Sequence, residues 1–227
     1  MNLKDKVVLA HRGFAHRKSH EKYRENSVDA CRESSQTDYV EIIELDLRKS
    51  KDGVLYCLHG NLLEYSFLLQ FPRIFSSLRE QYKADSLADI LEVISKDKIV
   101  FLDIKSTNIT RDDLLHVFEG REFKEVILGN KSVSFLDRFT DMPESFTKIL
   151  NGNIFCNFYD VDKLAEKGFT YFEAVFPFQI SNKAAHRVAK SGLMFRISGF
   201  GFLTKESYWK AIEKYNITHV SSDFIDI

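Results

Sequence analysis

The chain has 227 residues, of which 44% are hydrophobic and 13% aromatic, a composition typical of globular proteins. This composition excludes a disordered or collagen-like chain, and folding at this length buries roughly 70% of the surface around a core. The formal net charge of −1 provides no global field that would attract nucleic acid or an anionic membrane. We therefore expect no nucleic-acid partner, and any charged ligand must be bound by a local cluster.

The first six residues are too charged for a secretory signal peptide, and no apolar run approaches the roughly 18 residues of a membrane-spanning helix. We expect a cytoplasmic location without stable membrane insertion. Three prolines and no Gly/Ser-rich linker favour a single domain over residues 1–227. Cys31, Cys57 and Cys156 lie far apart without CxxC spacing, so they predict small buried side chains rather than disulfides or a zinc site. The oligomeric state stays open.

Short apolar runs alternate with longer amphipathic runs along the chain, as is typical of parallel strands joined by crossover helices. The pattern predicts about eight such strands, at residues 7–10, 40–47, 99–104, 125–128, 146–150, 171–176, 193–197 and 218–221. An additional strand at 54–58 follows a turn at Asp52-Gly53. Helices are predicted at 26–36, 61–82 with a break at Pro72, 87–94 after a Ser86 cap, 111–118, 132–139, 161–166, 182–190 and 205–215.

Eight parallel strands are the number that a closed (β/α)₈ barrel, or TIM barrel, requires. We therefore predict an α/β fold of this class. The alternative is an open, doubly wound sheet. No glycine-rich phosphate loop follows any predicted strand, which counts against that alternative.

Reactive groups in such barrels project from the C-terminal ends of the strands. Polar residues close four of the apolar runs and are the candidates for chemistry: His11 and Arg12; Glu44 and Asp46; His59; and Asp103 and Lys105. Taken singly, each set has a structural alternative, such as a charged edge strand or a plain ion pair. Together they would place carboxylates, imidazoles and fixed cations at one barrel mouth, as metal-assisted phosphoryl transfer requires. Oxygen ligands of this kind favour Mg²⁺ or Ca²⁺ over zinc.

A series of ordered motifs in the chain resembles the glycerophosphodiester phosphodiesterase family, which is related to the phosphatidylinositol phospholipase C-like barrel phosphodiesterases. The motifs are His11-Arg12-Gly13, Glu25-Asn26-Ser27, Glu44-Leu45-Asp46, Lys51-Asp52-Gly53-Val54 leading to His59, Ser86-Leu87, and Leu102-Asp103-Ile104-Lys105. The resemblance is dense over residues 7–60, fair over 85–106 and thin beyond. The family's fold is a (β/α)₈ barrel, which agrees with the strand count.

The resemblance also implies roles for individual residues. The family's two catalytic histidines correspond to His11 and His59. Its metal ligands correspond to Glu44, Asp46 and, where the family usually has glutamate, Asp103. Arg12 and Lys105 correspond to phosphate contacts, and Glu25 corresponds to a buried acid that holds Arg12. By analogy with related barrel phospholipases, His11 would be the base and His59 the acid.

The chain departs from the family pattern in three places. Gly60 stands where the family usually has aspartate after the second histidine. An aromatic-rich insertion at about 61–84 replaces an Arg-Thr-Thr-Gly pattern and is expected to form a lid. Residues 196–200 replace a Trp-Thr-Val-Asn stretch on the seventh strand.

The remaining histidines are not assigned to the site. His16 and His20 belong to a basic loop with Arg17, Lys18 and Lys22, which we interpret as a solvated loop. Structural roles are predicted for the other three, His116, His186 and His219.

The predicted function is a metal-dependent phosphodiesterase of lipid and glycerol metabolism. It would hydrolyse small-molecule glycerophosphodiesters to glycerol phosphate and an alcohol. The aromatic insertion motivates a phospholipase-type enzyme acting on lipid head groups as an alternative. Gly60 and the altered seventh strand motivate a third hypothesis, a non-catalytic barrel that binds phosphorylated ligands. The sequence leaves the released alcohol, the metal and the source of the nucleophile open.

Overall fold

The computed structural model describes residues 3, 5–60, 72–151, 161–175, 182–191, 193–198, 204–214, 217 and 219–226. Part of the predicted aromatic insertion, residues 61–71, lies outside this set, as does Cys156. All eight predicted parallel strands fall within it, at least in part.

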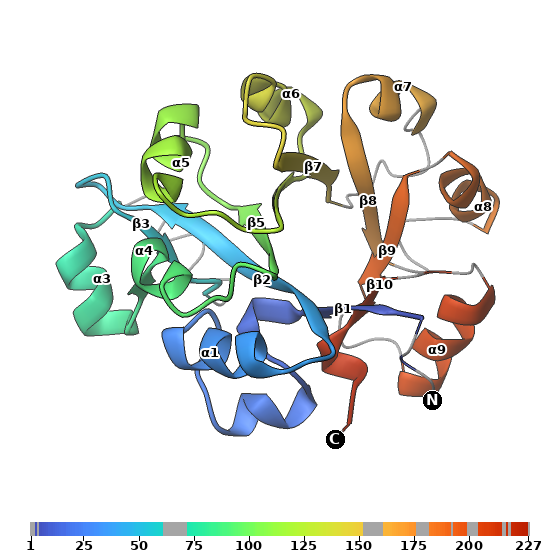
Figure 1. Ribbon diagram of the computed structural model, residues 1–227, viewed down its shortest axis with the longest axis horizontal. Helices are drawn as coiled ribbons and strands as arrows, with labels where there is room; N and C mark the ends of the chain where they lie inside the picture. Colours follow the sequence, from blue (N-terminus) through green and yellow to red (C-terminus); the bar gives the residue numbers. More distant parts are fainter. Residues whose placement is uncertain are drawn as a thin grey trace.

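Eight parallel strands form a closed ring (Figure 1). Their bounds are β1 Val7–Ala10, β2 Val40–Lys49, β5 Ile99–Ile104, β6 Glu125–Asn130, β7 Phe146–Leu150, β8 Phe169–Val175, β9 Met194–Ser198 and β10 His219–Ser221. Neighbours in this order pair in parallel, β10 pairs with β1, and the pairing of β1 with β2 closes the ring. The predicted barrel class is therefore confirmed, and the alternative of an open sheet is wrong.

Helices surround the strands on the outside of the ring (Figure 1). They are α1 Val28–Gln36, α3 Phe75–Tyr82, α4 Leu87–Leu91, α5 Arg111–Phe118, α6 Val133–Leu136, α7 Val161–Glu166, α8 Asn182–Lys190 and α9 Lys205–Lys214. The Ser86 hydroxyl accepts a hydrogen bond from the Asp89 amide at 3.0 Å, which confirms the predicted cap of α4. Helix α1 begins two residues later than predicted because Asn26 has φ +55° and Ser27 provides the cap.

A small antiparallel extension continues the sheet from the outer end of β2. Strand β3, Leu55–Cys57, pairs with β2, and β4, Asp85–Ser86, pairs with β3. Gly53 has φ +88° in the turn before β3, as the Asp52-Gly53 pattern predicts. Because β3 runs back toward the mouth of the barrel, it delivers His59 to the end of the barrel where the parallel strands terminate.

The core has an inner and an outer part. Apolar side chains fill the barrel interior, namely Leu9, Ile42, Ile99, Phe101, Ile127, Ile149 and Tyr171. A larger apolar layer lies between the strands and the helices, and it includes the buried free thiol of Cys31. Cys57 is likewise buried and free, as predicted. Above the inner layer the inward-facing positions of β2 become acidic, and the site begins there.

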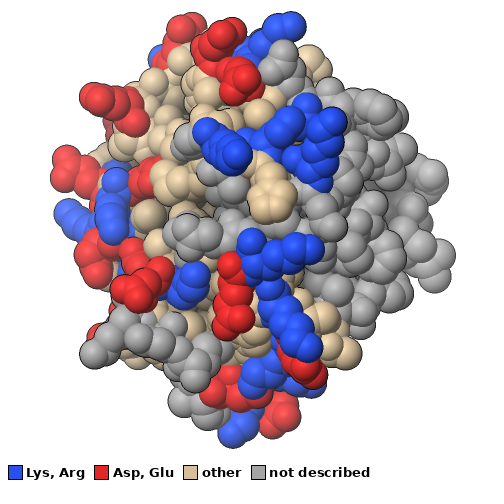
Figure 2. Space-filling model, turned by 90° about the vertical axis from the view of Figure 1, so that its right-hand side faces the viewer, with Lys and Arg blue, Asp and Glu red and all other residues tan. Residues whose placement is uncertain are grey.

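The side of the barrel covered by α7, α8 and α9 faces the viewer in Figure 2. Basic and acidic side chains both occur over the described part of this face, as the net charge of −1 leads one to expect. Among the described residues, no helix combines the length and apolar character needed to cross a lipid bilayer.

Candidate active site

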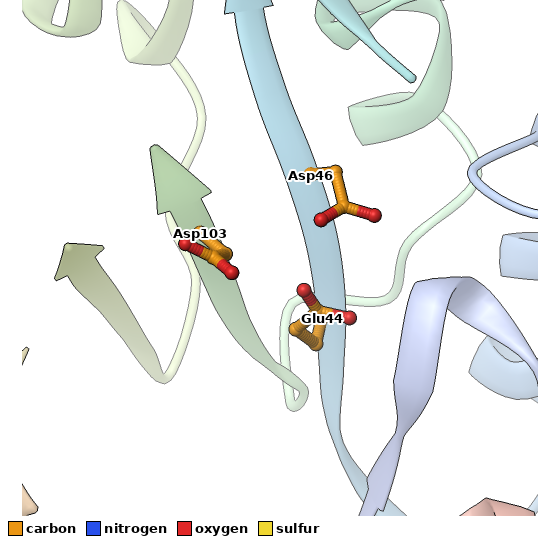
Figure 3. A group of neighbouring side chains, drawn as sticks. All are labelled: Glu44, Asp46 and Asp103. Carbon is orange, nitrogen blue, oxygen red and sulfur yellow. The ribbon is translucent and has the colours of Figure 1, made fainter. Parts of the chain in front are cut away.

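Three carboxylates come together at the C-terminal end of the barrel strands. Glu44 and Asp46 lie on one face of β2, two residues apart, and Asp103 lies directly opposite Asp46 on β5. One oxygen from each carboxylate lies within 4.8 Å of the others. Figure 3 shows the three side chains close to one another. The period-two alternation of a strand and the parallel register of β2 with β5 are therefore sufficient to build this cluster.

Lys105 lies against two of these carboxylates. Its Nζ is 3.1 Å from Asp46 Oδ1, and it also forms an ion pair with Asp103. Burial disfavours the ammonium charge, but Asp103 and Asp46 outweigh burial, so the pKa of Lys105 is raised well above its usual range. Asn151 donates its amide to the other oxygen of Asp103 at 2.8 Å. Asp103 is thus fixed from both sides, even though it is shorter than the glutamate that the family usually has.

Arg12 occupies a strained turn directly after β1. Its backbone has φ +53° and ψ +32°, a left-handed conformation that costs a non-glycine residue about 1–2 kcal/mol. The Arg12 amide donates to Glu44 Oε2 at 2.7 Å, and its guanidinium lies 2.7 Å from Glu25 and 3.5 Å from Asp46. Gly13 follows with φ +81°, and a Cβ there would lie 2.8 Å from the Cys31 sulfur. The turn therefore places the guanidinium over the carboxylates, and only glycine fits the next position.

Glu25 and Asn26 hold the other side of this turn. Glu25 forms the expected ion pair with Arg12, but its side chain is one-third exposed (32%) rather than buried. Asn26 is fully buried, and its side-chain amide donates to Asp46 at 2.9 Å while its side-chain oxygen accepts from the Asp46 amide. The Glu25-Asn26-Ser27 motif therefore links the helix cap of α1 to the carboxylate cluster.

His11 pairs with an acid that the sequence did not single out as a site residue. The ring nitrogen Nδ1 of His11 lies 2.7 Å from Asp223, in the turn after β10. Burial lowers the pKa of His11, but Asp223 and Glu44 outweigh burial, so its pKa is raised. The pairing makes Nδ1 the donor and leaves Nε2 as the nitrogen that accepts a proton.

His20 also reaches Asp223, with its Nε2 3.2 Å from Oδ1. The interpretation of the 16–22 segment as a solvated loop is therefore incomplete for this residue.

The side chain of Arg48 binds the backbone at His59. The fully buried guanidinium of Arg48 donates to the carbonyl oxygens of Leu58 and His59 at 2.8 and 3.0 Å. Gly60 follows with φ +76°, a conformation that an aspartate at this position would adopt only under strain. Burial lowers the pKa of His59. Gly60 therefore provides the turn that directs His59 into the pocket.

All of the predicted site residues except Glu25 line one pocket, namely His11, Arg12, Glu44, Asp46, His59, Asp103 and Lys105. Sequence reasoning missed Asp223, Ser221, Phe101 and the ion pair of Arg196 with Glu173, which also line it. Two signals were available: Arg196 and Asp223 lie near or just after the C-terminal ends of predicted strands, and Glu173 and Asp223 lie in segments that weakly resemble the family's last barrel strands.

The carboxylate cluster fits a hard divalent cation. The pocket lining contains five carboxylates and three permanently charged cations, so negative charge is in excess. Burial and the neighbouring Asp46 raise the pKa of Glu44 to about 7, and a cation beside this carboxylate would favour its ionised form. By contrast, Lys105 and Arg12 outweigh burial at Asp46 and hold its pKa well below the usual range. Closely spaced oxygen donors of this type suit Mg²⁺ or Ca²⁺.

Solved structures share the fold over nearly the whole chain. A glycerophosphodiester phosphodiesterase from Thermotoga maritima matches with a TM-score of 0.70 at 20% identity, covering 96% of this chain and 95% of that one. An Oleispira antarctica phosphodiesterase, solved in complex with the product sn-glycerol-3-phosphate, matches with a TM-score of 0.73 at 15% identity, covering 96% and 93%. The Agrobacterium tumefaciens glycerophosphodiester phosphodiesterase matches with a TM-score of 0.66 at 16% identity, covering 96% and 98%.

Comparison of the sequence with curated proteins gives no match. The sequence model of the glycerophosphoryl diester phosphodiesterase family, however, matches residues 11–70, the segment that carries His11, Arg12, Glu44, Asp46 and His59. This match confirms the resemblance predicted from the sequence motifs. Residues 11–70 therefore match the glycerophosphoryl diester phosphodiesterase family, and the whole chain shares the fold of solved glycerophosphodiester phosphodiesterases.

Proposed function

We propose that the protein is a metal-dependent phosphodiesterase that hydrolyses glycerophosphodiesters to glycerol phosphate and an alcohol, with His11 and His59 as the acid–base pair. The observation that supports it most strongly is the convergence of three carboxylates, two imidazoles and fixed cations in one pocket. The Oleispira antarctica phosphodiesterase was solved with its product sn-glycerol-3-phosphate, and this supports glycerol phosphate as the class of product here.

Glu44, Asp46 and Asp103 would hold the metal ion. When bound, a divalent cation polarises a phosphoryl oxygen and stabilises the charge that develops there. Arg12 and Lys105 border the same carboxylates, so their positive groups would bind the remaining phosphate oxygens. The metal ion and these two side chains would together place positive charge next to the phosphoryl group.

The two imidazoles would carry out the proton transfers of the reaction. Asp223 orients His11 so that Nε2 accepts the proton of the attacking oxygen, and the paired carboxylate stabilises the imidazolium that forms. His59 would donate its proton to the leaving alkoxide.

The test is product release from a panel of glycerophosphodiesters with Mg²⁺, Ca²⁺, Mn²⁺ or EDTA. We expect metal-dependent turnover that falls at least about 100-fold in Glu44→Gln, because the isosteric amide removes one anionic ligand. Glu41→Gln is the matched control, since Glu41 lies on the same strand but is 41% exposed and pairs with Lys124 outside the barrel. Turnover that survives both EDTA and Glu44→Gln would overturn the proposal.

The two alternative functions give different results in this assay. A phosphate-binding barrel would bind glycerol phosphate without multiple turnover. A phospholipase-type enzyme would prefer long-chain lipid substrates. That alternative depends on the insertion at about 61–84, of which residues 61–71 lie outside the described part of the chain, so it stays a prediction.

A further inference from the structure

We propose that His20 is a positioning residue that acts through Asp223 to hold His11 in the tautomer that the proposed reaction requires. The inference rests on the proposed function in that His11 is taken to be the base. It adds a residue from the loop after β1 that neither the sequence motifs nor the family match assigns to the site.

Asp223 bridges the two histidines with separate oxygens. Its Oδ2 lies 2.7 Å from His11 Nδ1, and its Oδ1 lies 3.2 Å from His20 Nε2. The Ser221 hydroxyl donates to Oδ2 at 3.2 Å. A carboxylate bound through both oxygens cannot rotate about its last bond without breaking a hydrogen bond. His20 therefore restricts the orientation in which Asp223 accepts the His11 proton.

His20 is itself fixed, although 45% of its side chain is exposed. Its ring stacks on the buried ring of Phe14, with centroids 3.9 Å apart and planes inclined by 32°. The short 3₁₀ helix that carries it, Arg17–Glu21, is anchored where the Arg17 amide donates to the Ile225 carbonyl oxygen at 3.1 Å. A backbone hydrogen bond thus holds the loop after β1 to the segment after β10 close to the His20–Asp223 contact.

The charge state of Asp223 is consistent with this bridge. Burial would raise the pKa of Asp223, but His11 and His20 outweigh burial and hold it well below the usual range. Asp223 therefore stays ionised and accepts from both rings, as the positioning role requires.

Two substitutions separate positioning from packing. His20→Phe keeps an aromatic ring on Phe14 but removes the donor to Asp223. His20→Gln removes the ring but keeps an N–H group at a similar distance from the backbone. A packing role predicts that the phenylalanine variant is tolerated and the glutamine variant is not, whereas the positioning role predicts the reverse. His116→Ala is the control, because the side chain of His116 lies on α5 and is 87% exposed.

The first readout is the ¹⁵N chemical shifts of the His11 ring in the full-length protein, assigned with His11→Gln. We expect the wild type, His20→Gln and His116→Ala to show the tautomer protonated at Nδ1. In His20→Phe the shifts should move toward the average of the two tautomers. This readout needs neither metal nor substrate, so it tests the inference even if the proposed function fails.

The second readout is steady-state hydrolysis. We expect kcat of His20→Phe to fall about 3- to 10-fold with KM unchanged within about 2-fold, because the substitution alters proton transfer rather than binding. His20→Gln should stay within about 2-fold of the wild type. Unchanged His11 shifts and unchanged kcat in His20→Phe would overturn the inference, as would a loss in His20→Gln with His20→Phe unaffected.

Discussion

The guanidinium of Arg48 holds the backbone carbonyl of His59 at 3.0 Å and that of Leu58 at 2.8 Å. Arg48 follows Asp46 on the inward face of β2 and is 1% exposed. One strand therefore supplies two metal-ligand candidates and, one position further along the same face, the group that fixes the second histidine. The carboxylates and His59 are consequently located relative to one another by a single rigid element.

Replacement of Arg48 by methionine should reduce both stability and turnover. Removing two charge-assisted hydrogen bonds is expected to lower the free energy of unfolding by about 2–4 kcal/mol. Loss of the anchored His59 backbone should lower kcat about 10-fold or more. Urea unfolding and steady-state kinetics well below the unfolding midpoint measure the two effects.

Leu45→Ala is the matched control for Arg48→Met. Leu45 lies on the same strand, is fully buried, and packs in the outer core rather than facing the pocket. It should lose a similar amount of stability, about 2–5 kcal/mol, while retaining its kcat. If both variants lose kcat equally, the effect follows general destabilisation and the anchoring role of Arg48 is wrong.

Metal binding should be detectable by thermal unfolding without any substrate. A ligand at about 100 times its Kd adds about 2.7 kcal/mol, which corresponds to a rise of roughly 5–10 °C for a chain of this size. We expect this rise with Mg²⁺ or Ca²⁺ in the wild type and its loss in Glu44→Gln. The metal-free variant should be at least as stable as the metal-free wild type, because it lacks one of three mutually repelling carboxylates. An equal rise in Glu44→Gln would place the ion elsewhere.

The positions of the strand ends could be predicted from the sequence because each one depends on a local pattern. An apolar run that ends in a polar residue is visible within about ten residues, and the barrel places all such ends at one mouth. The amino-acid pattern alone is therefore enough to predict seven residues that line the pocket, namely His11, Arg12, Glu44, Asp46, His59, Asp103 and Lys105.

The partners of these residues could not be predicted in the same way. Asp223 meets His11 only because β10 pairs with β1, which joins the two ends of the chain. A closed barrel makes the first and last strands neighbours, but periodicity does not give the strand register that decides which side chains meet. The same limit applies to Arg196, which the sequence marks as a departure from the family but whose partner Glu173 follows from the pairing of β8 with β9. Gly60 departs from the family pattern as well, and its positive φ gives the physical reason.

A methyl group at position 129 should disturb the floor of the site. In Gly129→Ala the new Cβ would lie 2.5 Å from the Phe101 ring, 2.9 Å from Ile149 and 3.1 Å from Asn151 Oδ1. Overpacking of this kind costs about 1–3 kcal/mol and here would displace Asn151, which positions Asp103. We expect a loss of that size in urea unfolding together with weaker metal-induced stabilisation.

Gly120→Ala serves as the control for the substitution at position 129. Gly120 has φ +70° and no atom within 4 Å of the added Cβ, so it tests backbone strain without overpacking. It should lose about 1 kcal/mol of stability and keep the full metal-induced shift. If metal-induced stabilisation is retained in Gly129→Ala, Asn151 is not needed to present Asp103.

His219 should make the protein less stable in mild acid. It lies at the base of the barrel interior, 5% exposed, with Tyr171 edge-on to its ring and Arg196 opposite it on β9. Burial, with a smaller contribution from Arg196, lowers the pKa of His219 to about 4. The unfolded chain, in which this pKa is about 6.5, then binds more protons than the folded protein between those values. The contribution of His219 to stability is therefore lost progressively as pH falls through this window.

The predicted loss amounts to about 2 kcal/mol between about pH 7 and about pH 5. His219→Phe keeps a ring against Tyr171 but cannot be protonated, so its unfolding free energy should fall by about 2 kcal/mol less than that of the wild type over the same interval. The comparison uses only the change in unfolding free energy of each protein between the two pH values. Any pH-independent effect of the substitution on stability therefore cancels. Because other titrating groups are common to both proteins, parallel pH profiles would show that His219 is not buried in its neutral form.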